Sequence, residues 1–228
     1  HNETSTGVTS PVYRVEAPDA LTLVDGTSIA GAAPVDLTRL DAYYFSLQKA
    51  LGSDGGLWVA ILSPAAIERA RRVEESADGR WVPQFLSLST AVDNSRKDQT
   101  LNTPALATIV MAERQVRWLL EHGGMDEVSA HCAQASSLIY DWAEANLAAR
   151  PFVENPTWRS PVTATIEIDE AANASELAAH LRARGIVDIG AYRGVGANQL
   201  RIGTWPSVEI EDVEALLGCI DYCLERVL

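Results

Sequence analysis

Two residues with complementary chemistry, Asp25 and Lys49, each end a short apolar run, "LTLVD" and "AYYFSLQK". The chain has 16 arginines but only two lysines, Lys49 and Lys97. Arginine stays protonated, whereas a desolvated lysine can lose its proton and act as a nucleophile or a Schiff-base partner. The choice of lysine favours covalent chemistry at Lys49, and a solvated surface lysine is the competing interpretation.

The elements that must position this pair are three predicted buried strands, at 21–25, 42–49 and 56–62. In open α/β sheets the ligand lies outside the carboxyl ends of the strands. Asp25 and Lys49 are separated by about one strand-to-strand connection, so we expect them at neighbouring strand ends. The pair predicts either a structural salt bridge or a pyridoxal-phosphate site, in which the acid keeps the pyridine nitrogen protonated.

A phosphate anchor is predicted at the start of the next helix, in "LNTPALATIVMAERQVRWLLEHGG" (101–124). Asn102 or Thr103 is expected to cap this helix, with Pro104 in its first turn. A helix N-terminus offers free backbone N–H groups and a positive dipole end to a phosphate. The expected apolar stripe of the helix consists of Leu106, Ile109, Val110, Val116 and Leu120.

The rest of the chain predicts a second, smaller α+β domain. A helix over 125–147 leads to an irregular connection, "ARPFVENPTWRSP". The expected elements after it are a strand at 162–168, a helix at 174–184, a strand-like run at 186–191, a strand at 199–205 and a helix at 209–226. We therefore expect an α/β protein with domains at 1–124 and 125–228.

Composition narrows the class of protein. With 228 residues, 47% hydrophobic and 21% charged, the chain suits one large or two small globular domains. Net charge −13 argues against a nucleic-acid partner, and no apolar run is long enough to predict a membrane span. Three scattered cysteines favour a reducing cytoplasm, and the four histidines lack metal-ligand spacing, so we expect no metal site.

Several motifs together resemble the phosphoserine aminotransferases, class V members of the fold-type I pyridoxal-phosphate enzymes, and most of all their actinobacterial branch. The motifs are "NETSTG" (2–7), "VDGTS" (24–28), "QK" (48–49) with "SDGGLW" (53–58), "LNTP" (101–104) and "YRGVGANQLR" (192–201). The resemblance implies the fold-type I transferase fold, with 1–124 as the C-terminal part of a large mixed-sheet domain and 125–228 as a linking helix and the small domain.

The resemblance also implies roles around the cofactor. Lys49 would be the Schiff-base lysine and would carry the proton between the substrate α-carbon and the cofactor C4′. Asp25 would pair with the pyridinium nitrogen. Thr4 would hydrogen-bond the cofactor 3′-oxygen, and Gln48 would contact its phosphate.

Four further residues would bind the partner's cofactor and the substrates. Asn102 and Thr103 would reach the phosphate in the other subunit, which implies a homodimer with shared sites. Arg201 would hold the substrate α-carboxylate, and Arg193 the phosphate or distal carboxylate. The implied reaction moves an amino group from glutamate to 3-phosphohydroxypyruvate, giving O-phosphoserine and 2-oxoglutarate in serine biosynthesis. Some relatives also serve pyridoxine synthesis.

Two departures from the family pattern keep alternatives open. Tyr192 stands where many members have histidine, and the upstream part of the pattern is absent, so the chain resembles the C-terminal portion of the enzyme. Residues 1–228 alone are accordingly expected to be aggregation-prone and inactive. The alternatives are a relative such as an alanine–glyoxylate aminotransferase or a cysteine desulfurase, or a non-catalytic fragment of the fold.

Overall fold

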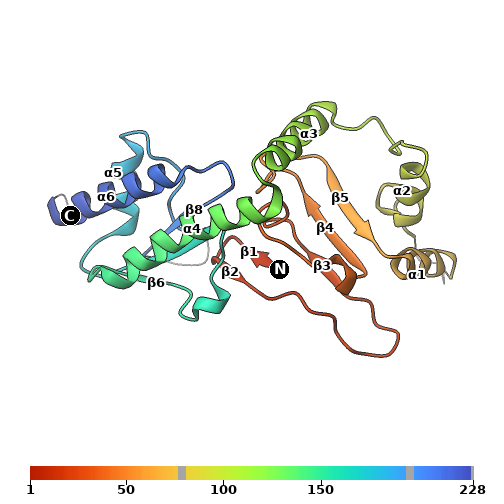
Figure 1. The fold of residues 1–228 in the computed structure, drawn as a ribbon, viewed down its shortest axis with the longest axis horizontal. Helices are drawn as coiled ribbons and strands as arrows, with labels where there is room; N and C mark the ends of the chain where they lie inside the picture. Colours follow the sequence, from red (N-terminus) through yellow and green to blue (C-terminus); the bar gives the residue numbers. More distant parts are fainter. Residues whose placement is uncertain (77–80, 194–197, 227–228) are drawn as a thin grey trace.

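The computed structural model describes residues 1–76, 81–193 and 198–226. The chain is elongated, with one three-stranded sheet in its N-terminal half and another in its C-terminal half (Figure 1). The long helix α4 (Gly124–Ala145) runs from the first half into the second, and the N-terminus lies between the two halves. No helix in the described ranges is both long and apolar enough to cross a membrane.

The N-terminal sheet has the strand order β3-β4-β5, from β3 (Leu23–Asp25), β4 (Ala42–Ser46) and β5 (Trp58–Leu62). Strands β3 and β4 are parallel, whereas β5 returns antiparallel to β4. Parallel neighbours end at the same edge of a sheet. The ends of β3 and β4 are therefore neighbours, as predicted, and Asp25 is the last residue of β3. Strand β4 ends at Ser46, so the prediction that Lys49 ends this strand is wrong by three residues.

The prediction that all three strands are buried is wrong. Only Ala42 and Tyr43 of β4 are buried, while Tyr44 is 43% and Trp58 45% exposed. The three runs are apolar, as predicted, but the described residues do not bury the side of the sheet that carries Tyr44 and Trp58. A pocket of about 880 Å³ also lies between the Tyr43 face of the sheet and helix α3.

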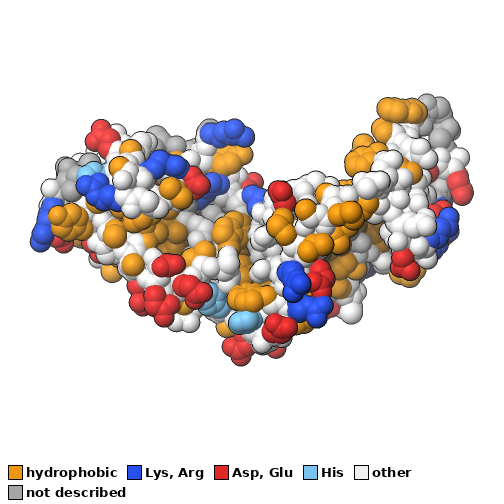
Figure 2. Space-filling view, turned by 90° about the horizontal axis from the view of Figure 1, so that it is seen from above, with side chains coloured by type: hydrophobic (Ala, Val, Ile, Leu, Met, Phe, Trp, Pro, Cys, Tyr) orange, Lys and Arg blue, Asp and Glu red, His pale blue; other side chains and the backbone are white. Residues whose placement is uncertain are grey.

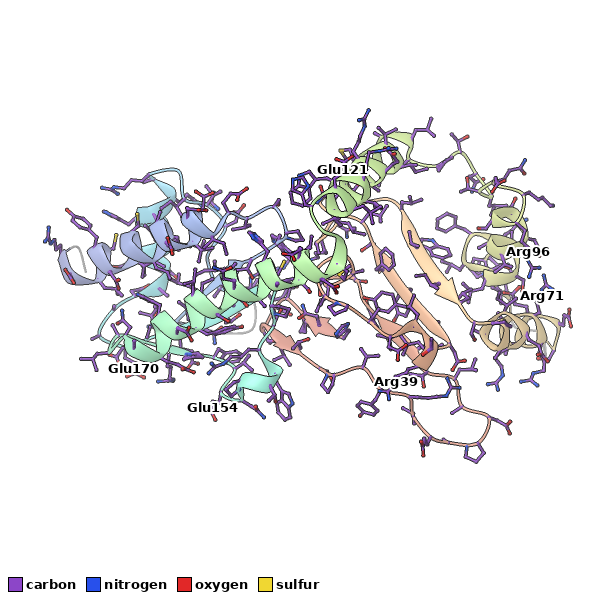
Figure 3. The ribbon with its side chains drawn as sticks, in the orientation of Figure 1. Arg39, Arg71, Arg96, Glu121, Glu154 and Glu170 are labelled. Carbon is purple, nitrogen blue, oxygen red and sulfur yellow. The ribbon has the colours of Figure 1, made fainter. Side chains whose placement is uncertain are left out.

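Two helices that were not predicted follow the sheet, α1 (Pro64–Glu75) and α2 (Leu88–Ser95). The Ser63 hydroxyl accepts a hydrogen bond from Ala66 N at 3.1 Å, which caps α1, and proline stands in its first turn. Arg71 of α1 and Arg96 after α2 both pair with Asp93, at 2.8 and 3.9 Å. Figure 3 labels the two arginines, which lie near each other on this side of the sheet. Short 3-10 turns lie at Leu37–Arg39 and Gln84–Leu86.

Helix α3 (Leu106–Glu121) begins later than predicted. Its N-cap is Ala105, which makes no side-chain cap, so the prediction that Asn102 or Thr103 caps the helix is wrong, as is the place of Pro104 in its first turn. Proline favours extended backbone in the residue before it, which keeps Thr103 out of the helix. The predicted apolar stripe exists but is exposed, up to 71% at Leu120, and Figure 2 shows hydrophobic side chains gathered on this side.

The C-terminal half contains an antiparallel sheet of order β6-β7-β8 and the helices α4, α5 and α6. Its core gathers buried side chains from both sheet and helices, among them Ile139, Ile166, Leu177, Leu200 and Ile220. The bounds are β6 (Ala149–Pro151), β7 (Thr163–Ile168), α5 (Ala174–Arg182), β8 (Gln199–Gly203) and α6 (Ile210–Arg226).

Two details of this half differ from the predictions. The connection expected to be irregular contains β6 and a 3-10 turn at Pro156–Trp158. The strand-like run at 186–191 forms no named strand, and contributes only a single bridge from Gly190 to Leu200. A three-residue strand and a single turn carry too little periodicity to be found in a sequence.

A small N-terminal hairpin joins the two halves. Its strands, β1 (Asn2–Glu3) and β2 (Val8–Thr9), are antiparallel. Gly7 has φ +74°, and a Cβ there would lie 2.7 Å from Thr163 O, so only glycine lets the turn approach β7 this closely. The Gly7 carbonyl accepts from Ser160 N at 2.9 Å.

A junction cluster of four buried side chains lies where the halves meet. Ala32 and Ala50 come from the N-terminal half, Cys132 from α4, and Val162 from just before β7. All four are at most 3% exposed. Ala50 directly follows Lys49, so the lysine stands beside a core that both halves build.

Candidate functional site

Asp25 is the last residue of β3, and Lys49 lies three residues beyond Ser46, the end of β4. Asp25 is exposed, and its Oδ1 accepts from Thr27 N at 2.8 Å. Lys49 is half-buried at the start of a turn in which its carbonyl accepts from Gly52 N at 2.8 Å. Within the described ranges the two side chains form no ion pair with each other. The structure therefore gives no support to the salt-bridge interpretation.

Tyr43 of β4 packs its ring against Gly26, directly after the end of β3, and was missed by sequence reasoning. A Cβ on Gly26 would lie 2.2 Å from Tyr43 Cζ, so the glycine after Asp25 makes room for the ring. Burial, and to a lesser degree the charge of Asp25, raise the pKa of Tyr43 to about 12. Its hydroxyl has no partner among the described residues. A glycine directly after a strand-end acid was the available signal.

Glu3 is a second site residue that sequence reasoning did not single out. Its Oε1 accepts from Ser5 N at 2.8 Å and from the Ser5 hydroxyl. The pKa of Glu3 is lowered, first by these bonds and then by the positive charges of Lys49 and Arg201. Lys49 and Arg201 are therefore both near enough to Glu3 for their charges to act on its carboxylate.

Arg201 joins the hairpin directly. Its Nη1 donates to the Thr4 carbonyl at 3.2 Å, across 197 positions of sequence. The guanidinium also lies over the ring of Tyr192, with Cζ 5.2 Å from the ring centroid. The structure thus brings together Thr4 and Arg201, while Arg193 is exposed.

Asn102 and Thr103 lie apart from this cluster, whereas Gln48 directly precedes Lys49 in the chain. All three are exposed. Asn102 and Thr103 line a pocket of about 660 Å³ between β5 and α2, next to the start of α3. Among the described residues, no hydrogen bond links Asn102 or Thr103 to Lys49, and Lys49 does not line this pocket. Within one chain, the predicted phosphate anchor and the lysine are therefore two distinct places.

The residues that meet here fit a pyridoxal-phosphate site in part. They supply a primary amine, a carboxylate at the neighbouring strand end and a guanidinium fork. Asn2 Oδ1 is buried without a partner in the described chain, while Asn2 Nδ2 donates to Ser28 Oγ at 3.0 Å. Because buried polar atoms are normally hydrogen-bonded, this acceptor is open to a ligand donor.

Comparison with known proteins identifies the family. The sequence model of the family described as "Aminotransferase class-V" matches residues 1–194. This chain belongs to the class V aminotransferases. The predicted membership of that class is confirmed.

Curated relatives of this class V chain carry a more specific name. It is 51% identical over 228 residues to a "Putative phosphoserine aminotransferase" of Mycolicibacterium vanbaalenii, covering 100% of this chain and 61% of the relative. It is 49% identical over 226 residues to the "Phosphoserine aminotransferase" of Corynebacterium glutamicum, covering 99% and 60%. The chain thus spans about three fifths of these relatives, and the resemblance expected from the motifs is confirmed.

Solved structures confirm the predicted fold. A phosphoserine aminotransferase from Cytophaga hutchinsonii superposes with a TM-score of 0.88 at 25% identity, covering 100% of this class V chain and 62% of that one. The enzyme from Bacillus circulans gives a TM-score of 0.81 at 26% identity, covering 97% and 57%. The α/β fold of this transferase class is therefore present.

Proposed function

We propose that the protein is a phosphoserine aminotransferase, which transfers an amino group between glutamate and 3-phosphohydroxypyruvate with pyridoxal phosphate as cofactor. The observation that carries the proposal is the parallel pairing of β3 with β4, which brings the strand that ends at Asp25 beside the strand that leads to Lys49. The relatives at 49–51% identity support the choice of substrates. A place in serine biosynthesis follows from that choice, and we keep pyridoxine synthesis as an accompanying role.

The proposed roles divide the site between cofactor and substrate. Lys49 would hold the cofactor covalently through Nζ, Asp25 would pair with its ring nitrogen, and Thr4 and Gln48 would contact its oxygen atoms. When bound, pyridoxal phosphate supplies the electron sink for negative charge at the substrate α-carbon. Lys49 Nζ, once free, would take the proton from that carbon and return it.

The two arginines would select the substrates. The Arg201 fork would bind the α-carboxylate, which every amino donor and acceptor carries. Arg193 would bind the phosphate or the distal carboxylate. Lys49 and Arg201 both lower the pKa of Glu3, so two cations lie near this carboxylate although the chain as a whole has net charge −13. This local positive charge supports a site that binds anionic substrates.

We further propose a homodimer in the cytoplasm, with Asn102 and Thr103 reaching the partner's cofactor phosphate. The exposure of both residues and of the apolar side chains along α3 supports an interface on this side. Three free cysteines, two of them buried, support a reducing compartment. We retain the division into a large-domain part, 1–124, and a small domain with its linking helix, 125–228. The start of α4 at Gly124 supports that boundary.

Borohydride reduction followed by peptide mapping tests the central assignment. We expect label on Lys49 and none on Lys97, which is exposed beyond α2 and serves as the matched control. Lys49→Arg should abolish transamination, because a guanidinium cannot serve as a deprotonated amine. Label on Lys97, or transamination by Lys49→Arg, would refute the assignment. Greater activity with glyoxylate than with phosphohydroxypyruvate would favour the alanine–glyoxylate alternative.

A further inference from the structure

The guanidinium of Arg201 is held on two sides by uncharged groups. Strand β8 fixes its backbone, because Arg201 pairs with Thr165 of β7 and its N–H donates to Ile189 O at 2.8 Å. Its Nη1 donates to the Thr4 carbonyl at 3.2 Å, and its planar face lies over the Tyr192 ring at 5.2 Å. In the described chain it pairs with no carboxylate within 4.0 Å, so its charge stays available to a ligand anion.

Within the described ranges, two other arginines stack on tyrosines, but in different surroundings. Arg159 lies 5.0 Å from the Tyr140 ring and also pairs with Glu144 at 2.6 Å, so a carboxylate already occupies its fork. Arg226 lies 5.1 Å from the Tyr222 ring near the end of α6. The contact between Arg201 and Tyr192 differs from both. Arg201 and Arg193, the residue after Tyr192, are the two cations that we propose bind the substrate.

Tyr192 also directly precedes Arg193 in the chain. The stack therefore fixes the backbone that carries Arg193 against the guanidinium of Arg201. An exposed arginine has many rotamers, and a ligand that must order it binds more weakly. The contact with Tyr192 orders the Arg201 side chain and anchors the backbone of Arg193. It therefore sets the spacing between the two arginines before a ligand binds.

We propose that Tyr192 is a positioning residue that orients the Arg201 fork and sets the spacing of Arg201 and Arg193, and so selects substrates with two anionic groups. The inference deepens the proposed function and rests on it. The aromatic face carries the effect, because a guanidinium stacks on the ring rather than on the hydroxyl. Phenylalanine should therefore replace Tyr192, whereas leucine should not.

Steady-state kinetics on the purified, cofactor-loaded protein test this role. Tyr192→Leu should raise KM for phosphohydroxypyruvate and glutamate about two- to fivefold, the effect of losing one exposed cation–π contact, with kcat retained. KM for pyruvate, which has only one anionic group, should rise less. Tyr192→Phe should restore parental KM values, and the matched control Tyr222→Leu should leave them unchanged.

A second readout is independent of turnover. Calorimetric titration of the cofactor-free protein with 2-oxoglutarate should show the same two- to fivefold weakening for Tyr192→Leu and none for Tyr192→Phe. Equal KM values for the leucine and phenylalanine variants, or equal rises for pyruvate and the dianions, would overturn the positioning role. If Arg201→Lys itself leaves every KM unchanged, the assignment of Arg201 fails, and the proposed site fails with it.

Discussion

Replacing Asp41 by asparagine tests the anchor at the start of β4, the strand that leads to Lys49. Asp41 is only 4% exposed and every oxygen of its carboxylate has a partner. Oδ2 accepts from Thr22 N at 2.9 Å and pairs with Arg14 at 3.2 Å, while Oδ1 accepts from Ser63 Oγ at 3.0 Å. The carboxylate thereby joins the residue before β3, the start of β4 and the cap of α1.

The magnitude follows from these partners. An amide can accept only one of the two hydrogen bonds, and losing a bond to a buried charge costs about 1.5–3 kcal/mol. The pair with Arg14 adds less than about 1 kcal/mol, because the Arg14 side chain is half exposed and its charge is screened. We therefore expect Asp41→Asn to destabilise the fold by about 2–4 kcal/mol at neutral pH. That corresponds to a loss of roughly 4–16 °C in Tm for a chain of this size.

The pH dependence separates charge from packing. The hydrogen bond from Thr22 N is the main cause that lowers the pKa of Asp41. A folded-state pKa below the unfolded value gives stability that is present above about pH 4 and is lost as the pH falls through the folded value. Thermal unfolding followed by circular dichroism should show the full Tm difference at pH 7 and a smaller one below about pH 3.5.

A matched control is Asp36→Asn. Its carboxylate also accepts from a backbone N–H, that of Thr38 at 3.0 Å, but the side chain is exposed. This variant should shift Tm much less than Asp41→Asn. An identical Tm difference for Asp41→Asn at pH 3.5 and pH 7 would refute the electrostatic reasoning and leave altered packing as the cause.

Three further predictions concern the site. Asp25→Asn should lower turnover by about 100-fold or more while cofactor affinity changes little, since the charge acts on the reacting system and the phosphate contacts remain; unchanged turnover would leave Asp25 a structural role only. Arg201→Lys should raise KM in both half-reactions, whereas Arg193→Lys should affect the phosphorylated substrate more, and equal mild effects would contradict these assignments. Gly26→Ala should lower stability by about 1–3 kcal/mol, because its Cβ would overlap the buried Tyr43 ring, and an unchanged Tm would show that the ring can move aside.

The sequence predicted the strands better than their surroundings. Runs of aromatic and β-branched residues identified β4 and β5, and the rule for parallel strand ends placed Asp25 beside the end of β4. The exposure of Tyr44 and Trp58 was not predictable, since periodicity reports an apolar face but not what covers it.

Only those parts of the candidate site that depend on residues close together in the sequence could be predicted. The link between Thr4 and Arg201 spans almost the whole chain, and no local motif encodes such a contact. The start of α3 was misplaced because polar residues before a proline resemble a cap whether or not the helix begins there. Helix α1, by contrast, could have been predicted, because Ser63 is a typical N-cap and Pro64 a typical first residue of a helix.

The junction cluster beside Lys49 bears on which sequence changes the protein can tolerate. Ala32, Ala50, Cys132 and Val162 come from three separate parts of the chain and pack in one small core. A larger side chain at Val162 would have to displace neighbours in this cluster, and Ala50, whose backbone continues from Lys49, is one of its four members. A substitution in the C-terminal half would then be tolerated only if it leaves the position of Lys49 in the N-terminal half unchanged. We expect the two halves to vary together at these positions in related sequences, and exchange of one half between relatives to succeed only when this cluster is exchanged with it.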